Sequence, residues 1–546
     1  MLIYEILIFN INLIYLSYKL WITDINSDIP IYIYILLFLL ILLNTCETTG
    51  ILNRIYNTRF IKYTRNEKER GITCGVNTVL SVLIALLISQ MEIANATNFR
   101  YLFYCVNLTI LFSYSYWILN IIIRVYSNIY RTVVGIISIA ILYFIISNCA
   151  EYSGISRLYY VIPCLICAVD YYFLIVDIKG SFTLSEGSIV AQGFTLLINE
   201  SMIYCTSKLN LVKHPSIFNF ERSDIFSMLE VLIVGSILTY FILIPLFQKV
   251  LSCYNKKNDK HYLSEDREQY RILYQKYSIY SWAGLIILIL TCLMPYSTHI
   301  IHQNPFIWVI KYVFVTRRLF LVCWWLCLLS TIVIAFNWLM GKTKTLSDLN
   351  NKRKFYHMLS VLMFFPGYLI DRDFMFLSFS VAFSGMIMAE VIRFFKLYPL
   401  GEIIHKFMTT FIDQKDTGTA ILSHIYLLIG CALPVWLNSL SSKIIPGVSG
   451  ILALGIGDTM ASIIGYRYGK THWPKSKKTV EGTCGFIASI ILFIFITSIF
   501  YSYEYTVVQW VKFVLFVILT GLLEAESNQN DNLILPLFLF SLTSTI

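Results

Sequence analysis

The sequence has little charge and no long polar segment. Asp, Glu, Lys and Arg make up only 14% of its 546 residues, whereas soluble domains average about 25%. Hydrophobic residues reach 57%, and the mean hydropathy is +0.69. The longest polar stretch, about residues 250–277, mixes both signs of charge and is typical of a solvated loop. This composition excludes a water-soluble globular protein and predicts a chain embedded in a lipid bilayer.

Several common signatures are also missing. The first apolar segment lacks a basic leader and a small-residue cleavage site, so we do not expect a cleaved signal. The thirteen cysteines are scattered, and the Cys164-x-x-Cys167 pair lacks the second half of a zinc site. No P-loop motif and no internal repeat is visible. The net charge of +10 lies in loops between apolar segments, so we expect no nucleic-acid partner.

What is present is a succession of apolar runs from end to end. Each is about 16–22 residues long, which is roughly enough for a helix to cross a bilayer. They predict an all-α, polytopic integral membrane protein with about 15–17 transmembrane helices, including spans over 187–205 and 532–545. We divide the chain into an N-terminal multi-span membrane region, 1–340, and a C-terminal catalytic membrane region, 341–546, which contains most of the polar motifs.

The distribution of basic residues predicts the orientation of these spans. Basic residues gather in the loops 52–72, 341–354 and 467–478. An even number of predicted spans separates each loop from the others, so all three are expected to face the cytosol. The same count places residues 524–531 on the cytosolic side and the sequon Asn95-Ala96-Thr97 on the lumenal side.

The stretch "GDTMASIIGYRYGKTHWPKSKKTVEG", residues 457–482, is too polar for a helix that only faces lipid. On a helix, Asp458, Ser462, Gly465 and Gly469 fall on one face of small side chains. Close helix packing accounts for the glycines but not for Asp458, which can hold Mg²⁺ at the end of a span. Lysines beside a span are typical interfacial anchors, but a cluster of them can also neutralise phosphates. The stretch therefore predicts a phosphate site.

Two further motifs lie upstream. Arg353, Lys354 and His357 share one helix face at the start of a span, where an interfacial anchor explains the cations but not the imidazole. Asp416 precedes a span that contains His424. A helix N-cap and a buried, hydrogen-bonded histidine are the alternatives to functional roles for these two residues.

The last polar motif is a turn before the final apolar segment. It consists of Glu524, Glu526, Gln529, Asn530, Asp531 and Asn532. A plain turn does not need carboxylates and amides against a membrane, so we expect a functional role. The predicted spans 483–502 and 508–523 form a hairpin that would bring this turn beside the lysines of residues 470–478.

Together these motifs resemble those of the dolichol kinase family. Residues 457–462, Gly465, Gly469 and the run "KKTVEGT" (477–483) are similar to its CTP-binding signature, which related polyprenol and phytol kinases and membrane cytidylyltransferases share loosely. "RKFYHM" (353–358), "DQKDTGTAILSHIYLLIGCALPVWL" (413–437) and "LLEAESNQNDNLILPL" (522–537) match in order and spacing. "SFTLSEG" (181–187) resembles a weaker N-terminal element. The close similarity covers about residues 350–546.

The resemblance implies an enzyme of the endoplasmic reticulum membrane, with its active site facing the cytosol. It would transfer the γ-phosphate of CTP to the terminal hydroxyl of dolichol or a related polyprenol, making dolichyl phosphate for protein glycosylation. Asp458 would hold Mg²⁺ or another divalent cation, and Asp531 or Asp416 would act as the base. The implied CTP-binding residues are Gly457, Asp458, Ser462, Gly465, Gly469, Lys477, Lys478, Thr479, Glu481 and Gly482. Further polar motif residues are Arg353, Lys354, His357, His424, Glu524, Gln529 and Asn532.

Two alternatives stay open. A membrane cytidylyltransferase that makes a CDP-lipid could use the same nucleotide motif, but it would release pyrophosphate instead of CDP. A multi-span transporter would explain the number of spans and the intramembrane polar residues. The polar residues gather at one predicted face instead of the midplane, and this pattern favours the enzyme.

Overall fold

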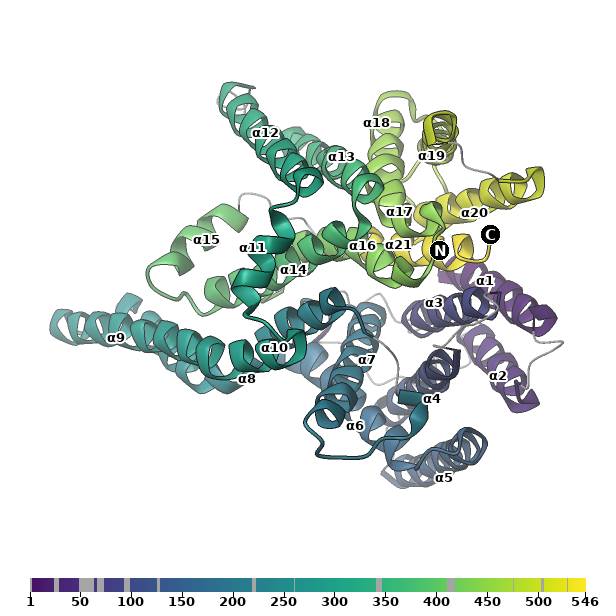
Figure 1. Cartoon of the computed structure of the whole chain (residues 1–546), viewed down its shortest axis with the longest axis horizontal. Helices are drawn as coiled ribbons and strands as arrows, with labels where there is room; N and C mark the ends of the chain where they lie inside the picture. The colour runs from purple at the N-terminus through teal and green to yellow at the C-terminus, as the bar shows by residue number, and fades with distance from the viewer. Residues whose placement is uncertain are drawn as a thin grey trace. The chain divides into compact units, whose positions relative to one another are not determined.

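The computed structural model describes residues 2–23, 29–48, 63–65, 73–92, 99–124, 128–218, 222–259, 261–339, 346–409, 418–474, 476–501, 505–527 and 529–546. Within these ranges every regular element is a helix (Figure 1), apart from one antiparallel bridge between His472 and Thr479. The predicted all-α class is therefore confirmed.

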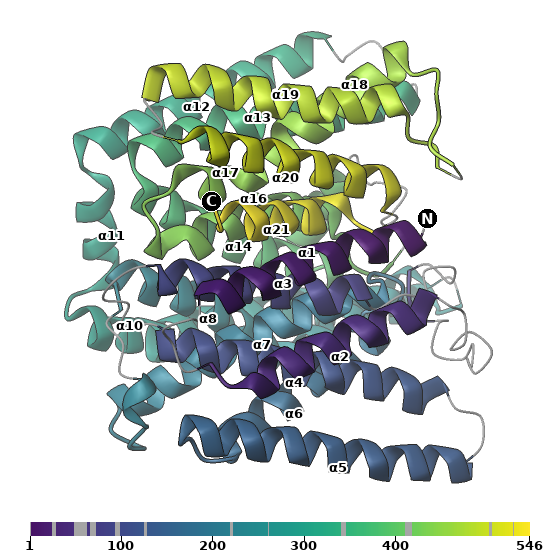
Figure 2. The same ribbon diagram turned by 90° about the vertical axis from the view of Figure 1, so that its right-hand side faces the viewer.

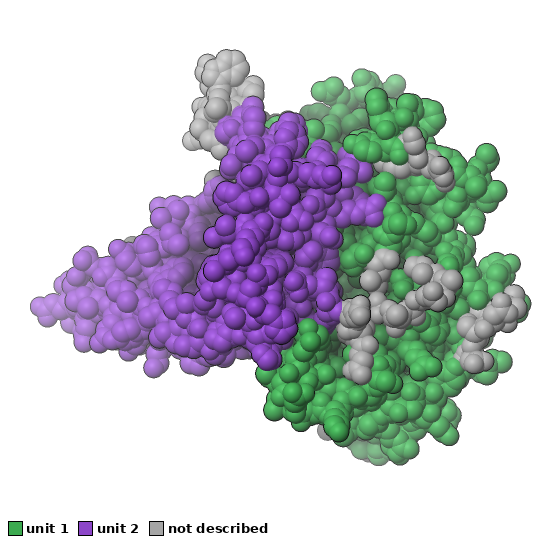
Figure 3. All heavy atoms as spheres, in the orientation of Figure 1, with its two compact units in different colours: residues 1–220, 354–362, 429–546 green, residues 221–353, 363–428 purple. Residues whose placement is uncertain are grey.

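The chain forms two compact units, which Figure 3 shows in different colours. Unit 1 comprises residues 1–220, 354–362 and 429–546, and unit 2 comprises residues 221–353 and 363–428. The predicted N-terminal region, 1–340, thus contributes to both units. The catalytic assignment of residues 341–546 stays a prediction.

Most helices lie entirely within one of the two units. Those of unit 1 are α1 (Leu2–Thr23), α2 (Ile31–Thr48), α3 (Thr73–Met91), α4 (Phe99–Arg124), α5 (Asn128–Ser153), α6 (Leu158–Tyr172), α7 (Leu184–Lys208), α17 (Ile444–Gly450), α18 (Thr459–Tyr468), α19 (Val480–Tyr501), α20 (Val507–Glu526) and α21 (Asp531–Thr543). Those of unit 2 are α8 (Asp224–Asn258), α9 (Ser264–Leu288), α10 (Met294–Ile301), α11 (Pro305–Val313), α12 (Thr316–Leu339), α14 (Arg372–Phe394) and α15 (Leu400–Thr409).

Two helices contribute residues to both units, and five short segments have non-α turns. The shared helices are α13 (Leu346–Ile370) and α16 (Ser423–Leu437). The π-helical segments are η4 (Phe173–Asp177), η6 (Ile289–Leu293) and η8 (Ile451–Asp458), and the 3₁₀ segments are η5 (Ser216–Phe218) and η7 (Asn438–Leu440).

In the part of the chain that the structure describes, fewer helices than predicted are long and apolar enough to cross a membrane. Among the described residues, ten helices are long and apolar enough to cross a membrane, or eleven if α11 and α12, bent by 84°, form one span. Three predicted spans are short apolar helices: Ile31–Thr45, Ser423–Leu437 and Asp531–Thr543. The predicted span over 187–205 lies in α7, which does not qualify because it carries buried polar residues such as Gln192 and Asn199.

The final helix, α21, lies in the interior of unit 1. Residues 532–543 are all buried, and α21 packs against α3, α17 and α20. Figure 2 shows α19, α20, α21 and α1 following one another as neighbouring rods. A helix that is apolar on every side is stable when other helices surround it. The predicted final span is therefore a core helix of unit 1. Asp531 is the first residue of this helix.

The core of unit 2 forms where α8 packs against α9 and α14. Its buried side chains include Leu243, Phe247 and Val250 of α8 and Val391 and Ile392 of α14. Gly284 of α9 faces Leu243, and an added Cβ there would lie 2.9 Å from a methyl group of that leucine. These contacts make the α8–α9 pair a closely packed hairpin.

Candidate active site

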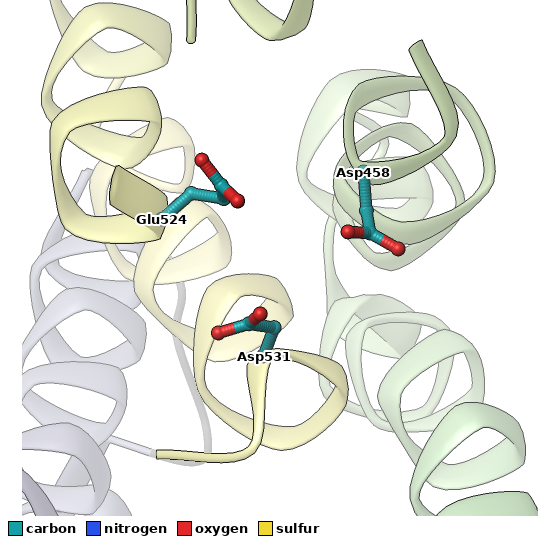
Figure 4. Close-up of side chains that lie close together, drawn as sticks. All are labelled: Asp458, Glu524 and Asp531. Atoms are coloured by element: carbon teal, nitrogen blue, oxygen red, sulfur yellow. The ribbon is translucent and has the colours of Figure 1, made fainter. Parts of the chain in front are cut away.

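Three carboxylates from separate helical elements meet in unit 1. Asp458 ends η8, Glu524 lies in the last turn of α20, and Asp531 is the first residue of α21. One oxygen of each lies within 4.8 Å of the others. Figure 4 shows the three side chains extending into a common space. Like charges at this distance repel strongly, so the arrangement requires cations beside it.

Two residues of α13 contact Asp458. The Lys354 ammonium lies 2.8 Å from Asp458 Oδ2 and also donates to the Asp458 carbonyl oxygen at 3.1 Å. The His357 ring nitrogen Nδ1 is 3.2 Å from the same Oδ2. Sequence alone allowed an interfacial anchor for Lys354. Instead, both side chains are directed into the protein and hold the carboxylate that we predict to bind metal.

Lys478 contacts the other two carboxylates. Its Nζ lies 2.9 Å from Glu524 Oε1 and 3.2 Å from Asp531 Oδ2, and it also donates to the Glu524 carbonyl oxygen. Burial alone would lower the pKa of Lys478, but the charges of Asp531 and Glu524 outweigh it and raise the pKa above the ordinary lysine value. Lys478 is therefore a permanent cation at neutral pH.

A hairpin-like loop between α18 and α19 positions Lys478. Thr471 N donates to both carboxylate oxygens of Glu481, at 3.1 and 3.2 Å, and Trp473 Nε1 donates to Thr483 Oγ1 at 3.0 Å. Ser476 Oγ donates to the Ala525 carbonyl oxygen at 3.3 Å, which fastens the loop to the end of α20. Glu481 thus has a structural contact in addition to its predicted role at the CTP site.

The glycines of the motif surround Thr479. Thr479 Oγ1 accepts a hydrogen bond from Gly482 N at 3.2 Å at the start of α19. An added Cβ on Gly465 or Gly469 would lie 2.9 Å from this hydroxyl oxygen, and one on Gly482 would lie 2.8 Å from the Ala461 carbonyl oxygen. The glycines therefore allow α18 and α19 to pack closely, which is the packing role weighed for them from the sequence.

The donor set fits a divalent cation. Mg²⁺ is usually bound through one or two carboxylates together with phosphate oxygens and water, and three carboxylates converge here. Asp531 Oδ1 is buried and has no hydrogen-bond partner among the described residues. A buried carboxylate oxygen without a partner is costly, and a bound cation or a substrate hydroxyl would satisfy it.

Comparisons with known proteins identify the family of the chain. The family model described as dolichol kinase matches residues 272–446. The dolichol kinase sec59 of Schizosaccharomyces pombe is 32% identical over 379 residues, which cover 67% of this chain and 68% of that protein. The chain belongs to the dolichol kinase family.

Other members of the dolichol kinase family match at similar identity. The dolichol kinase EVAN of Arabidopsis thaliana is 33% identical over 383 residues, covering 68% of this chain and 65% of that protein. The human dolichol kinase is 32% identical over 293 residues, covering 48% of this chain and 53% of that protein. The matched part of the chain thus spans between about half and two thirds of these relatives' lengths. No solved structure matches the chain.

Several further predicted site residues lie in unit 1. Gln529 Oε1 accepts from Thr183 Oγ1 at 2.8 Å, and Asn532 N donates to Asn530 Oδ1 at 3.1 Å at the start of α21. Lys477 is exposed beside Lys478, and Ser462 is half-buried on α18. Gly457 packs against the ring of Phe486, 2.5 Å from where its Cβ would lie.

Other predicted residues cannot be placed at the site. Asp416 lies outside the described residues, as does Lys475, and the Arg353 side chain is not described. His424 is half-buried in α16 and belongs to unit 2. The role of Asp416 as an alternative base stays a prediction.

Sequence reasoning did not single out two features of the site. The π-helical segment η8 carries Asp458, and such wide turns are frequent at functional sites. Gly455 within η8 lets α13 approach, because an added Cβ would lie 2.3 Å from Val361 Cγ2 and 3.3 Å from the His357 carbonyl oxygen. The glycine three residues before Asp458 is the sequence feature that could have indicated this close helix contact.

Proposed function

We propose that this chain transfers the γ-phosphate of CTP to the terminal hydroxyl of dolichol, giving dolichyl phosphate and CDP. Membership of the dolichol kinase family and the printed names of its relatives support this reaction. The observation that carries it is the meeting of Asp458, Glu524 and Asp531 with Lys354 and Lys478 in one place. Phosphoryl transfer needs mainly positioning and charge neutralisation, and this cluster supplies both.

Asp458 and Glu524 are the proposed ligands of Mg²⁺ or another divalent cation. When bound, such a cation neutralises phosphate charge and orients the transferred group. Lys354 keeps Asp458 ionised and fixes its carboxylate, and His357 holds the same oxygen from the neighbouring turn of α13. Because this carboxylate is already held in place, it can bind a cation without changing its conformation.

Lys478 is the proposed phosphate clamp, with Lys477 beside it. Its ammonium already lies within 3.2 Å of two carboxylates, so it can contact a phosphate at the same place as a bound cation. Charge-assisted contacts of this kind are shorter and stronger than neutral hydrogen bonds.

Asp531 is the leading candidate for the base. Its Oδ2 faces Lys478, whereas its Oδ1 has no partner among the described residues and can accept the proton of the dolichol hydroxyl. Asp416 is the other candidate. Dolichol would reach this carboxylate from the bilayer, because a long polyprenol chain does not leave the hydrocarbon and only its hydroxyl needs to meet the water-exposed site.

We further propose that the enzyme lies in the endoplasmic reticulum membrane with the site facing the cytosol. The basic loops 341–354 and 467–478 support this orientation by the positive-inside rule. Lys354 and Lys478 come from the ends of these loops and face the same carboxylate cluster in unit 1. This shared cluster supports placing the two loops on the same side of the membrane.

One experiment tests the reaction against its alternatives. Purified enzyme in mixed micelles is incubated with Mg²⁺, γ-labelled CTP and either dolichol, phytol or diacylglycerol. Transfer of label to dolichol with equimolar release of CDP is expected. Release of pyrophosphate would indicate a cytidylyltransferase, and label found only in phytol or diacylglycerol would refute dolichol as the acceptor.

A further inference from the structure

A buried ion pair that is separate from the carboxylate cluster also lies in unit 1. Arg65 Nη2 lies 2.6 Å from Glu186 Oε1, and the two side chains are 6% and 0% exposed. A buried pair is poor evidence of stability by itself, because desolvation offsets most of the attraction. The role of this pair therefore depends on the other contacts of the Glu186 carboxylate.

The same carboxylate contacts the loop that carries Asp531. Glu186 Oε1 accepts a hydrogen bond from Asn530 N at 3.1 Å, across 344 residues of sequence. Asn530 directly precedes Asp531 and caps α21 through its own Oδ1. One oxygen of Glu186 thus holds the peptide next to the candidate base.

The surrounding contacts hold Glu186 in place. Glu186 and Thr183 form a capping box at the start of α7, with Thr183 N donating to Glu186 Oε2 at 3.3 Å. Thr183 Oγ1 donates to Gln529 Oε1 at 2.8 Å, so the same helix end contacts two successive residues of the loop. Arg65 N donates to the Phe182 carbonyl oxygen at 2.9 Å, which fixes the arginine beside α7.

We propose that Glu186, held by Arg65, is a positioning residue for Asp531. The N-terminal end of α7 fixes the position and direction of the first turn of α21. It thereby fixes where the Asp531 carboxylate lies relative to Lys478. This inference rests on the proposed function and gives the N-terminal region of the chain a part in the reaction. A misplacement of a catalytic group by about 1 Å can lower a rate by about 100-fold. A small change at Glu186 is therefore expected to slow phosphoryl transfer.

Glu186→Asp tests the proposal while preserving charge. The shorter side chain can still face Arg65 and the helix end, but it is withdrawn from Asn530 N. In solubilised full-length enzyme, we expect turnover at saturating CTP to fall about tenfold or more per folded molecule, with CTP-analogue binding and Mn²⁺ binding unchanged. Arg65→Lys keeps the charge but not the fork geometry, and a smaller loss of the same kind is expected.

The matched control is Glu230→Asp. Glu230 forms an equally buried pair with Arg222, with side chains 4% and 2% exposed, at the start of α8 in unit 2. This variant is expected to lower the unfolding temperature about as much as Glu186→Asp while leaving turnover per folded molecule unchanged. Equal turnover losses in both variants would show a general stability effect and would overturn the proposal.

A double-mutant cycle distinguishes positioning from an independent effect. If Glu186 acts through Asp531, Glu186→Asp adds no further loss of turnover in an Asp531→Asn background. Additive losses, or full turnover in Glu186→Asp, would overturn the proposal. Absence of dolichol phosphorylation in the unmodified enzyme would instead refute the proposed function, and CTP-analogue and Mn²⁺ binding would still be measurable in every variant.

Discussion

At the scale of single residues, the charge balance of the cluster explains what it can bind. Two lysines face three carboxylates, so the carboxylates carry one negative charge more than the lysines neutralise. In the proposed reaction, a divalent cation would reverse the sign of this charge and make the site attractive to the phosphates of CTP. The lysines keep the carboxylates together before the cation binds, when their mutual repulsion would otherwise separate them.

Asp458→Asn is expected to abolish most activity while leaving expression unchanged. A neutral amide is a poor Mg²⁺ ligand, and it also gives up the ion pair with Lys354. Turnover should fall by about 100-fold or more, as for the loss of other groups that stabilise transition-state charge. Activity is measured across a magnesium titration together with Mn²⁺ binding; wild-type behaviour in both would show that Asp458 is not a metal ligand.

Lys478→Gln is expected to raise the KM for CTP with little change in the KM for dolichol. One charge-assisted contact contributes roughly 1.5–3 kcal/mol, so the change should be about tenfold or more. Lys406→Gln is the matched control, because Lys406 is exposed on α15 in unit 2, whereas Lys478 carries the contacts to Glu524 and Asp531. A CTP dependence equal to that of the unmodified enzyme would leave Lys478 with only a structural role.

The raised pKa of Lys478 also predicts the pH behaviour of its ion pairs. A lysine whose pKa is higher in the folded protein stabilises the fold fully below the ordinary lysine pKa of about 10.4, and the contribution is lost only as the pH rises through the raised value. Any loss of activity in the mildly alkaline range should therefore persist in Lys478→Gln. If that loss disappeared in the variant, titration of Lys478 would be its cause.

At the scale of elements, the close contact of α18 with α19 sets the place of the Lys478 loop. Gly482→Ala is expected to destabilise the protein by roughly 1–3 kcal/mol, the range found for overpacked sites, because the new Cβ would lie 2.8 Å from a backbone oxygen of α18. Gly193→Ala on α7 is the control, because nothing lies within 4 Å of its added Cβ. Thermal unfolding in detergent measures both; equal unfolding temperatures would show that the contact adapts at little cost.

The first turn of α21 is expected to be needed for turnover and not for nucleotide binding. Asp531→Asn should lower turnover at saturating CTP by about 10²–10⁴-fold, the usual contribution of a general base, and leave binding of a CTP analogue nearly intact. Asp224→Asn, at the equivalent first position of α8, controls for loss of a charge at a helix N-terminus. Full turnover in Asp531→Asn would exclude it as the base and leave Asp416 as the candidate.

The sequence predicted which loops meet but not how their side chains pair. The predicted hairpin of spans 483–502 and 508–523 placed Asp531 beside the loop of Lys478, and the structure brings these two side chains together. The pairing of Lys478 with Glu524 depends on the register of the loop against α20, which no local pattern encodes. The contact of Glu186 with Asn530 links positions 344 residues apart. Hydropathy also could not distinguish α21, a core helix, from one that faces lipid.

At the scale of the whole molecule, contacts within unit 1 place Glu92 near the beginning of one candidate span. Lys443, just before α17, lies 3.4 Å from Glu92, which in turn lies 2.9 Å from Lys19. Asp458 follows Lys443 by 15 residues along one continuous helical path, or about 22 Å at 1.5 Å per residue. Glu92 therefore lies near the start of the candidate span Ile444–Tyr468, whereas Asp458 lies further along the same span.

The predicted orientation can be tested with two glycosylation sites, one on each side. Asn95, in the sequon after Glu92, lies outside the described residues and is expected in the lumen, where it can be glycosylated. Lys477→Asn creates a second sequon with Thr479 in the exposed loop beside the carboxylate cluster, which is expected in the cytosol. In microsomes, the unmodified chain should show an endoglycosidase-sensitive mass shift that Asn95→Gln removes, whereas Lys477→Asn should add none. A glycan gained by Lys477→Asn would place the site in the lumen and would contradict an active site that takes CTP from the cytosol.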